Sequence, residues 1–143
     1  MEKYIILAGG GVQGIMPIAF VIDHAAMDAG FYFKQAEVHG MAQRGGAVQS
    51  NLRYGDGEIW SDISPTGKAD MVLSVEPLEA MRYRQFLRPS GWVVTSTTPF
   101  VNIPNYPETE SLLDDLAGID NIVMVDTAHF ARVAGNRRAQ NMV

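Results

Sequence analysis

A glycine-rich segment near the N-terminus has the residue types and spacing of a binding loop. Residues 9–14 read Gly-Gly-Gly-Val-Gln-Gly and fit the pattern G-x-G-x-x-G through Gly9, Gly11 and Gly14. Successive backbone N–H groups before a helix form a site for anions such as phosphate, and Gln13 adds a polar side chain beside them. A tight strand-to-helix turn also requires glycine for its dihedral angles, so the pattern supports both interpretations.

A second segment, residues 39–46, places histidine, glutamine and arginine among glycines and small residues directly after a predicted strand. Glycines allow a backbone to approach a ligand or partner closely, and an arginine can bind a carboxylate or phosphate through two parallel hydrogen bonds. We therefore predict a binding site or interface here, with these candidate residues: His39, Gln43, Arg44, Gly45 and Gly46. The alternative is an exposed surface loop in which Arg44 is solvated.

A single acidic residue, Glu76, ends another predicted buried strand and precedes Pro77. Ligands of α/β folds gather at the carboxyl edge of the strands, where this carboxylate could orient a cofactor or a partner group. It could equally cap the helix that follows. The sequence assigns no catalytic residue.

The composition excludes several classes of site. The 143 residues include no cysteine and three histidines, and the net charge is −5. Disulfides, a cysteine nucleophile and an ordinary iron–sulfur cluster are therefore excluded, and we expect no metal site. The negative charge argues against nucleic-acid binding, and no apolar run has the length needed to span a bilayer. Because the N-terminus lacks the basic-then-apolar layout of a signal peptide, we expect a cytoplasmic protein.

The hydrophobic pattern predicts an α/β fold that positions these segments. Strands are expected at residues 4–8, 31–38, 71–75, 92–96 and 121–125, and helices at 15–29, 78–87 and 109–117, with further helix from 127 and at 135–143. Residues 47–54 and 58–62 flank Gly55-Asp56-Gly57, which predicts an antiparallel hairpin. We expect a single three-layer α/β/α domain with a mixed sheet and this hairpin insertion, and a helix at 15–29 that is covered on most sides.

Residues 37–48, which read Glu-Val-His-Gly-Met-Ala-Gln-Arg-Gly-Gly-Ala-Val, resemble the gamma-type domain of 2-oxoacid:ferredoxin oxidoreductases. The form His-Gly-Met-Ala-Gln-Arg-Gly-Gly is most similar to the indolepyruvate branch. The resemblance covers residues 1–143 as one such domain, through further matches in order: Ser64-Pro65, Gly67-Lys68-Ala69-Asp70, Glu76-Pro77-Leu78-Glu79-Ala80 with Arg82, Ala134-Gly135-Asn136 and Asn141. It departs at Val12, where the family has glycine, and at Val143, past which the family continues with more helix, so the chain could be C-terminally truncated.

The resemblance implies the small, cofactor-free beta subunit of an indolepyruvate-type enzyme, inactive by itself. The enzyme would decarboxylate an arylpyruvate such as indolepyruvate oxidatively, with coenzyme A as acyl acceptor and ferredoxin as electron acceptor. Thiamine diphosphate and 4Fe–4S clusters would lie on a large partner subunit. The lack of cysteine agrees with this, and residues 81–85 lack the asparagine that would complete a thiamine motif with Gly55-Asp56-Gly57. Both glycine-rich segments would then line the interface with the partner, where we expect coenzyme A to approach because its phosphates require N–H groups and an arginine.

Two alternatives remain open. The G-x-G-x-x-G pattern, with Glu37 at roughly the spacing of a ribose-binding acid, favours a stand-alone Rossmann-like nucleotide-binding oxidoreductase. Against this, the chain after Glu37 enters a glycine-rich segment and a hairpin, where a dinucleotide-binding half would continue into a second crossover helix. The other alternative is a purely structural module for assembly. The sequence does not determine which 2-oxoacid is used.

Overall fold

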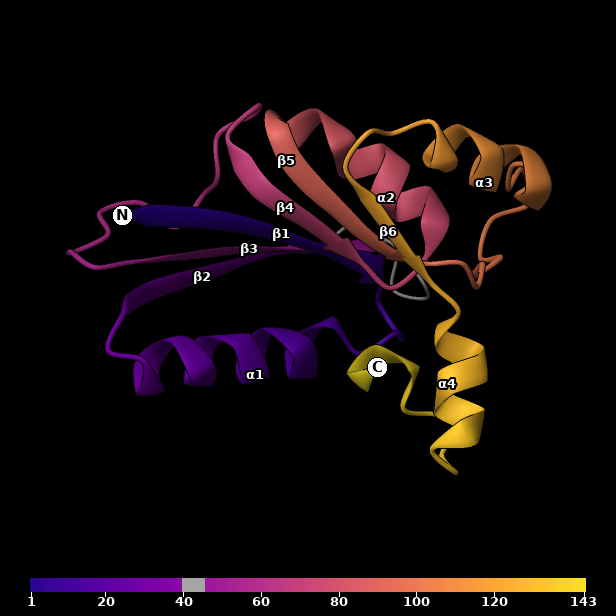
Figure 1. Ribbon diagram of the computed structural model, residues 1–143, viewed down its shortest axis with the longest axis horizontal. Coiled ribbons are helices and arrows are strands. Elements are labelled where there is room, and N and C mark those ends of the chain that lie inside the picture. The colour runs from indigo at the N-terminus through magenta and orange to yellow at the C-terminus, as the bar shows by residue number, and fades with distance from the viewer. Residues whose placement is uncertain (40–45) are drawn as a thin grey trace.

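A six-stranded mixed sheet organises residues 1–39 and 46–143, the part of the chain that the computed structural model describes (Figure 1). The strands are β1 (Glu2–Gly10), β2 (Tyr32–His39), β3 (Ala47–Gly55), β4 (Ala69–Ser74), β5 (Leu87–Ser96) and β6 (Ile122–Val125). Their order across the sheet is β2-β3-β1-β4-β5-β6. Strands β1, β4, β5 and β6 are mutually parallel, whereas β3 is antiparallel to both β1 and β2.

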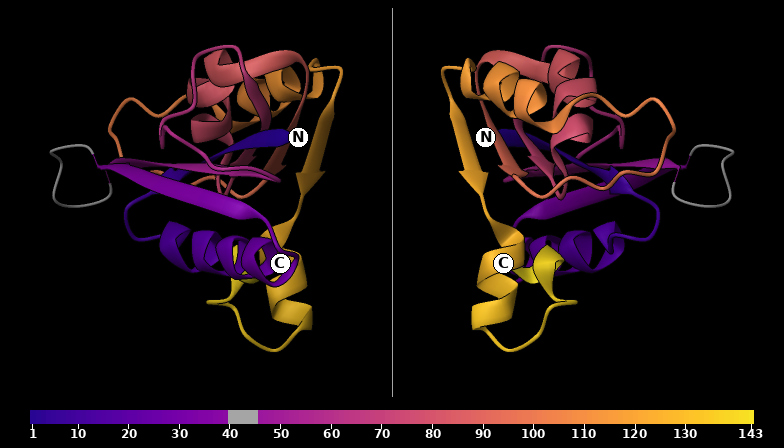
Figure 2. Two further views of the ribbon diagram at one scale, coloured as in Figure 1. Left: turned by 90° about the vertical axis from the view of Figure 1, so that its left-hand side faces the viewer. Right: turned by 90° about the vertical axis from the view of Figure 1, so that its right-hand side faces the viewer.

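Helices cover both faces of this sheet, which confirms the predicted three-layer α/β/α class. They are α1 (Ile15–Asp28), α2 (Pro77–Tyr83), α3 (Thr109–Ala117) and α4 (Thr127–Val133), with short 3-10 turns at Arg84–Phe86 and Gln140–Met142. Helices α2 and α3 lie on one side, and α1, α4 and the C-terminal segment lie on the other (Figures 1 and 2). The carboxyl ends of β1, β4, β5 and β6 therefore meet at one edge, between the two layers of helices.

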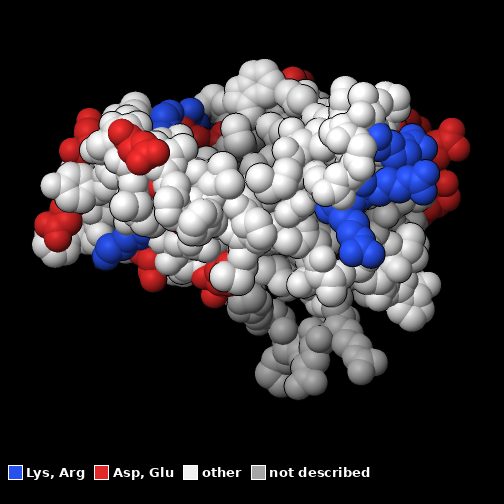
Figure 3. Space-filling view, turned by 90° about the horizontal axis from the view of Figure 1, so that it is seen from below, with Lys and Arg blue, Asp and Glu red and all other residues white. Residues whose placement is uncertain are grey.

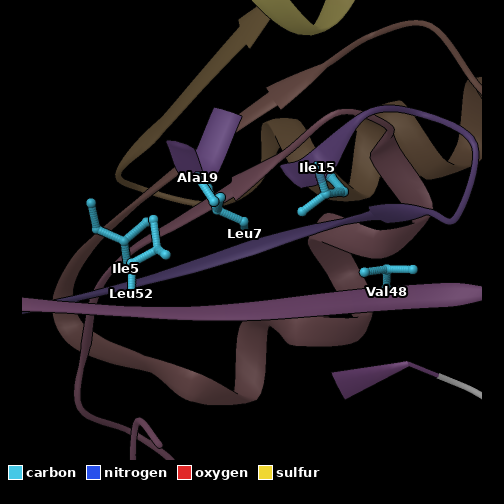
Figure 4. Packing of buried hydrophobic residues seen from close by; sticks show 6 residues of the cluster. All are labelled: Ile5, Leu7, Ile15, Ala19, Val48 and Leu52. Carbon is cyan, nitrogen blue, oxygen red and sulfur yellow. The ribbon is translucent and has the colours of Figure 1, made fainter. Parts of the chain in front are cut away.

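The core has a compartment on each face of the sheet. Between α1 and the sheet, β-branched and leucine side chains of β1 and β3 pack against the inner face of the helix (Figure 4). The buried members of this cluster are Ile5, Leu7, Ile15, Ala19, Val48 and Leu52. On the other face, Val93 of β5 packs with Ala80 of α2 and with Leu112 and Leu116 of α3. These two clusters hold the strand ends and the helix starts in fixed positions at the carboxyl edge.

The predicted hairpin around Gly55-Asp56-Gly57 is wrong in its location. Residues 58–62 form no strand, and the antiparallel partners of β3 are β1 on one side and β2 on the other. The antiparallel element is therefore the β2–β3 pair, whose connection contains residues outside the described part of the chain. Gly55 instead ends its strand beside the chain start, where Asp56 accepts a hydrogen bond at 2.5 Å from the N-terminal ammonium of Met1. Because both neighbours of β3 are already in place, no second hairpin strand can pair there.

The expectation that residues 15–29 are covered on most sides is also wrong. Only Ile15, Ala19, Asp23 and Ala26 of α1 are buried. Met16 and Phe20 are 60% and 61% exposed. Figure 3 shows this face of the molecule, where uncharged residues fill the middle and charged ones lie toward the ends. The helix packs on the sheet through one stripe of side chains. Because the opposite stripe is also apolar, the periodicity of apolar residues does not reveal which stripe is buried.

Candidate functional site

The register of the sheet brings the two glycine-rich segments together. Gly9 of β1 pairs with Val48 of β3, and Val48 pairs on its other side with His39 of β2. Beyond these pairs, the N–H of Gly11 donates to the carbonyl of Gly46 at 2.9 Å. The two segments thus share one end of the sheet. The candidate residues Gln43, Arg44 and Gly45 lie outside the described residues, so their predicted role stays a prediction.

The first glycine loop is held by hydrogen bonds within the chain. Gln13 accepts the Gly10 N–H through its Oε1 at 2.7 Å, and its own N–H donates to the Gly10 carbonyl at 2.9 Å. Together with the bond from Gly11, three of the loop's N–H groups are already donating to the chain itself. Pro17 has no N–H to offer in the first turn of α1. The loop therefore has fewer donors for an anion than its glycine pattern predicts.

Two of the loop glycines are required by packing. A Cβ on Gly9 would lie 2.5 Å from Cγ2 of Val75 and 2.7 Å from Cδ1 of Ile15, so strand and helix approach too closely for any side chain. Gly14 has φ 73°, a left-handed conformation, and a Cβ there would lie 2.5 Å from Nδ2 of Asn141. The interpretation that the turn requires glycine for its dihedral angles is confirmed for Gly14, whereas Gly9 lies within β1 and is limited by the space around it. Val12, the departure from the family pattern, is 69% exposed.

Glu76 caps the helix that follows it, as one of its two interpretations predicted. Its side chain is the N-cap of α2 and accepts the N–H of Glu79. The other carboxylate oxygen accepts the hydroxyl of Tyr106 at 2.7 Å, and only 2% of the residue is exposed. Burial, reinforced by this bond, raises the pKa of Tyr106. Because both carboxylate oxygens have partners within the chain, a role in orienting a cofactor stays a prediction.

A cleft beside the glycine loop contains residues that the sequence did not point to. The C-terminal segment folds back across the start of α1, where Asn141 donates from Nδ2 to the Gly14 carbonyl at 3.1 Å. The resulting cleft has a volume of about 420 Å³. Its walls come from the glycine loop, the ends of β4 and β5 and the C-terminal segment: Val12, Gln13, Val75, Thr98, Pro99, Phe100, Arg137, Arg138, Gln140 and Asn141.

Sequence reasoning missed Arg137 and Arg138 at this cleft, and it also missed Thr98 and Phe100. The consecutive arginines were the available signal, but nothing local shows that their segment returns to the first glycine loop. That contact includes the hydrogen bond between Asn141 and Gly14, which are 127 positions apart in the sequence. Phe100 packs against the loop, since a Cβ on Gly10 would lie 3.1 Å from its ring. The sequence indicates Asn141 only through the resemblance to a family.

A second, apolar pocket adjoins the cleft and shares Val75, Gln140 and Asn141 with it. It has a volume of about 310 Å³ and lies between α1, the ends of β4, β5 and β6, and the C-terminal residues. Val94 and Met142 are among its walls. Within the described ranges, no group of three or more His, Cys, Asp or Glu side chains could hold a metal ion. No helix in that same part of the chain combines the length and the hydropathy needed to cross a membrane.

Comparison with known proteins identifies relatives of the whole chain. Residues 4–143 match the family model described as pyruvate ferredoxin/flavodoxin oxidoreductase. The chain is 34% identical over 150 residues to indolepyruvate oxidoreductase subunit IorB of Archaeoglobus fulgidus, covering 100% of this chain and 74% of the relative. It is 39% identical over 119 residues to the protein of the same name from Pyrococcus horikoshii, covering 78% of this chain and 58% of the relative.

Solved structures share the fold at lower identity. The 2-oxoglutarate:ferredoxin oxidoreductase of Magnetococcus marinus, solved with 2-oxoglutarate, coenzyme A and succinyl-CoA bound, matches with a TM-score of 0.71 and 16% identity, over 99% of this chain and 23% of the larger one. Pyruvate oxidoreductase subunit PORC of Thermotoga maritima matches with a TM-score of 0.69 and 18% identity, over 97% of this chain and 70% of that one. The family match and the curated relatives agree over nearly the full length, and the chain belongs to the pyruvate ferredoxin/flavodoxin oxidoreductase family.

Proposed function

We propose that the chain is the small subunit of an indolepyruvate-type 2-oxoacid:ferredoxin oxidoreductase. The observation that carries this proposal is the alignment of the entire chain with proteins named indolepyruvate oxidoreductase subunit IorB, at 34% identity for Archaeoglobus fulgidus. The complete enzyme would convert an arylpyruvate and coenzyme A to the acyl-CoA and carbon dioxide, and would pass the two electrons released to ferredoxin. We expect the chain to be inactive alone and to act in the cytoplasm.

The cofactors of this reaction would lie on a larger partner subunit. Iron–sulfur clusters are held mainly by cysteine thiolates, and this chain has none. Gly55-Asp56-Gly57 is engaged with the chain start through the bond between Asp56 and the Met1 ammonium. This supports its interpretation as a turn rather than part of a thiamine site. Thiamine diphosphate and the 4Fe–4S clusters are therefore assigned to the partner, and ferredoxin would be reduced there.

We place coenzyme A at the carboxyl edge of the sheet, where the two glycine-rich segments meet. The contact between Gly11 and Gly46 supports a shared surface for both segments. An enzyme that contains the same fold, from Magnetococcus marinus, was solved with coenzyme A bound. Arg44 remains the residue of the second segment that we expect to contact an anionic group or the partner.

The architecture weighs against the stand-alone dinucleotide-binding alternative. In a dinucleotide-binding fold the strand after the first helix pairs directly beside the first strand. Here β3 lies between β1 and β2. Glu37, the candidate ribose-binding acid, lies on β2 opposite Ser50 and accepts a hydrogen bond from Gln35 at 3.3 Å. The acid is thus one strand farther from the glycine loop than that function requires.

Reconstitution with a candidate large subunit tests the proposal. The assay measures reduction of a ferredoxin-like dye with indolepyruvate and coenzyme A, with and without this chain, and compares pyruvate and 2-oxoglutarate as substrates. We expect activity only when both subunits are present and a preference for indolepyruvate. Equal activity of the large subunit alone would contradict the proposal. Tight binding of NAD(P) or FAD by the isolated chain would favour the dinucleotide alternative instead.

The Arg44→Ala variant tests the predicted interface within the same assay. We expect it to weaken either complex assembly or the dependence on coenzyme A, with Arg84→Ala as a control at an exposed position on another part of the chain. If both properties match the wild-type complex, the second glycine-rich segment has no role in the interface. Normal assembly and turnover by variants in both glycine loops would favour the purely structural alternative.

A further inference from the structure

Helix α1 presents an uncharged surface to the solvent, away from the sheet (Figure 3). Four exposed side chains that recur every three or four residues form its outward stripe: Met16, Phe20, His24 and Met27. Between Ile15 and Met27 the sequence has a single Asp, Glu, Lys or Arg, which is Asp23, and that residue is buried. Contiguous exposed surface of this kind marks an interaction site.

The centre of the outward stripe is already ordered within the chain. The rings of Phe20 and His24 lie with their centroids 3.8 Å apart, and His24 donates from Nδ1 to the Phe20 carbonyl at 2.8 Å. Because both side chains are held in one geometry beforehand, a partner that binds them has less conformational entropy to overcome. Met16 and Met27 flank these rings, and their flexible side chains can adapt to an opposing surface.

The two ends of α1 have complementary charges that the helix itself does not compensate. Its N-cap, Gly14, provides no side-chain cap, and the first turn contains no acidic residue. At the other end Asp28 lies in the last turn, which contains no basic residue. Among the described residues, the ion pairs do not include Asp28. A carboxylate favours the N-terminus of a helix and disfavours its C-terminus, so each end would be stabilised by the opposite end of an antiparallel copy.

We propose that the outward stripe binds a second copy of this chain, with the two α1 helices packed antiparallel about a two-fold axis. Such an axis buries the same surface on both copies. With the axis midway between Phe20 and His24, the Phe20 ring of each copy meets the His24 ring of the other. The same register brings Asp28 beside Met16 and the first turn of the other helix. Because the stripe is uncharged, the net charge of −5 places no like-charge pair at its centre.

Sedimentation velocity of the full chain over a range of concentrations tests this contact. The inference goes beyond the proposed function and does not depend on it, because only this chain is needed. We expect the mass to rise from that of a monomer to that of a dimer with concentration. Phe20→Glu places carboxylates near the axis and should raise the dissociation constant at least about tenfold, equivalent to about 1.4 kcal/mol.

Trp60→Glu is the matched control for Phe20→Glu. Trp60 is 82% exposed. Its segment packs on the sheet face opposite α1, because the Ser64 N–H donates to Asn51, which alternates along β3 with Leu52 of the α1 cluster. We expect this variant to dimerise as the wild type does. A wild-type chain that stays monomeric, or equal dimerisation by the Phe20→Glu and Trp60→Glu variants, would overturn the proposal.

Asp28→Lys tests the charge pattern at the helix ends. A lysine in the last turn suits the dipole of its own helix, so the variant monomer should unfold at a higher urea concentration than the wild type. In the dimer the same lysine meets the positive end of the other helix, so dimerisation should weaken. A purely structural role of Asp28 would not move these two properties in opposite directions. Dimerisation as strong as that of the wild type would overturn the antiparallel arrangement.

Crosslinking tests the direction of packing directly, because the chain has no cysteine of its own. Met16 and Met27 lie about 16 Å apart along one helix but adjacent across the proposed contact. A short bis-maleimide should therefore join copies of the Met16→Cys/Met27→Cys variant, and should join neither single variant. Equal crosslinking of the single variants would overturn the arrangement. So would a monomeric chain whose Phe20→Glu variant fails to bind the large subunit, since the stripe would then belong to that interface.

Discussion

The Gly14→Ala substitution tests how the C-terminal segment is held over the glycine loop. Gly14 is the N-cap of α1 with φ 73°, and its carbonyl accepts the hydrogen bond from Asn141 at 3.1 Å. An alanine there has two costs. It must adopt a left-handed backbone conformation, and its Cβ would lie 2.5 Å from Nδ2 of Asn141, which must move away.

The structure provides an internal reference for the first cost. Gly30, just past the other end of α1, has φ 81°, and a Cβ added there would meet no atom within 4 Å, so Gly30→Ala has only the backbone cost. That cost is about 1–2 kcal/mol for an L-residue in this region. Gly14→Ala should exceed it by about 1 kcal/mol, the net contribution of the Asn141 hydrogen bond that is lost when the side chain moves.

Urea denaturation of the wild type and of the Gly14→Ala, Gly30→Ala and Asn141→Ala variants measures these free energies of unfolding. The double variant Gly14→Ala/Asn141→Ala completes a cycle. We expect the cost of Gly14→Ala to fall to that of Gly30→Ala once the Asn141 side chain is removed.

A cost of Gly14→Ala no larger than that of Gly30→Ala would refute the reasoning. So would additive costs in the double variant, because they would show that Gly14 and Asn141 do not interact.

Three further predictions concern the stability of the layers around the site. Tyr106→Phe removes the hydroxyl that donates to buried Glu76 at 2.7 Å, and should lower the free energy of unfolding by about 1.5–3 kcal/mol in urea titrations; a loss below about 0.5 kcal/mol would contradict this role. Leu116→Ala, at a position with 0% exposure in the α3 cluster, should cost about 2–5 kcal/mol, whereas Asp115→Ala beside it on the exposed face should change little. Burial raises the pKa of Asp23, so the folded state binds a proton on this carboxylate more tightly than the unfolded chain does. The stability that this protonation provides is fully present below the unfolded pKa of about 3.9 and is lost as pH rises through the folded pKa. Asp23→Asn should therefore stabilise the protein at about pH 7 and have no effect at about pH 3; a loss of stability at neutral pH would indicate a partner for the ionised carboxylate.

Local signals predicted those elements whose boundaries depend on nearby residues. The helix predicted at 109–117 is α3, because Glu108 accepts the N–H groups of Glu110 and Ser111 at its start and Gly118 ends it. The strand predicted at 4–8 is β1, which extends to Glu2–Gly10 because its ends pair with β3 beyond the apolar run. The predicted helix at 78–87 is shorter, since the chain leaves α2 through a 3-10 turn and enters β5 at Leu87.

Which strands pair, and which face of a helix packs on the sheet, depends on residues far apart along the chain. The wrong predictions concern these long-range contacts. Gly55-Asp56-Gly57 has the composition of a hairpin turn, but whether two strands pair depends on which edges are free, and both edges of β3 are occupied by β1 and β2. The exposed stripe of α1 is as apolar as the buried one, so periodicity could not tell that Phe20 faces outward while Asp23 faces the sheet.

The sequence by itself determined the α/β class, the absence of cysteine chemistry and the two glycine-rich segments, since each depends on residue type and short-range spacing. It also contained the resemblance to 2-oxoacid:ferredoxin oxidoreductases, and the family comparison confirms that the chain belongs to this family. Only the tertiary structure decided that Gly11 contacts Gly46, that Glu76 is held by Tyr106, and that Arg137 and Arg138 lie beside the first glycine loop. These contacts join residues far apart along the chain, and they form only because the parallel strands bring their carboxyl ends to one edge, where a segment such as Asn141 can bond to Gly14.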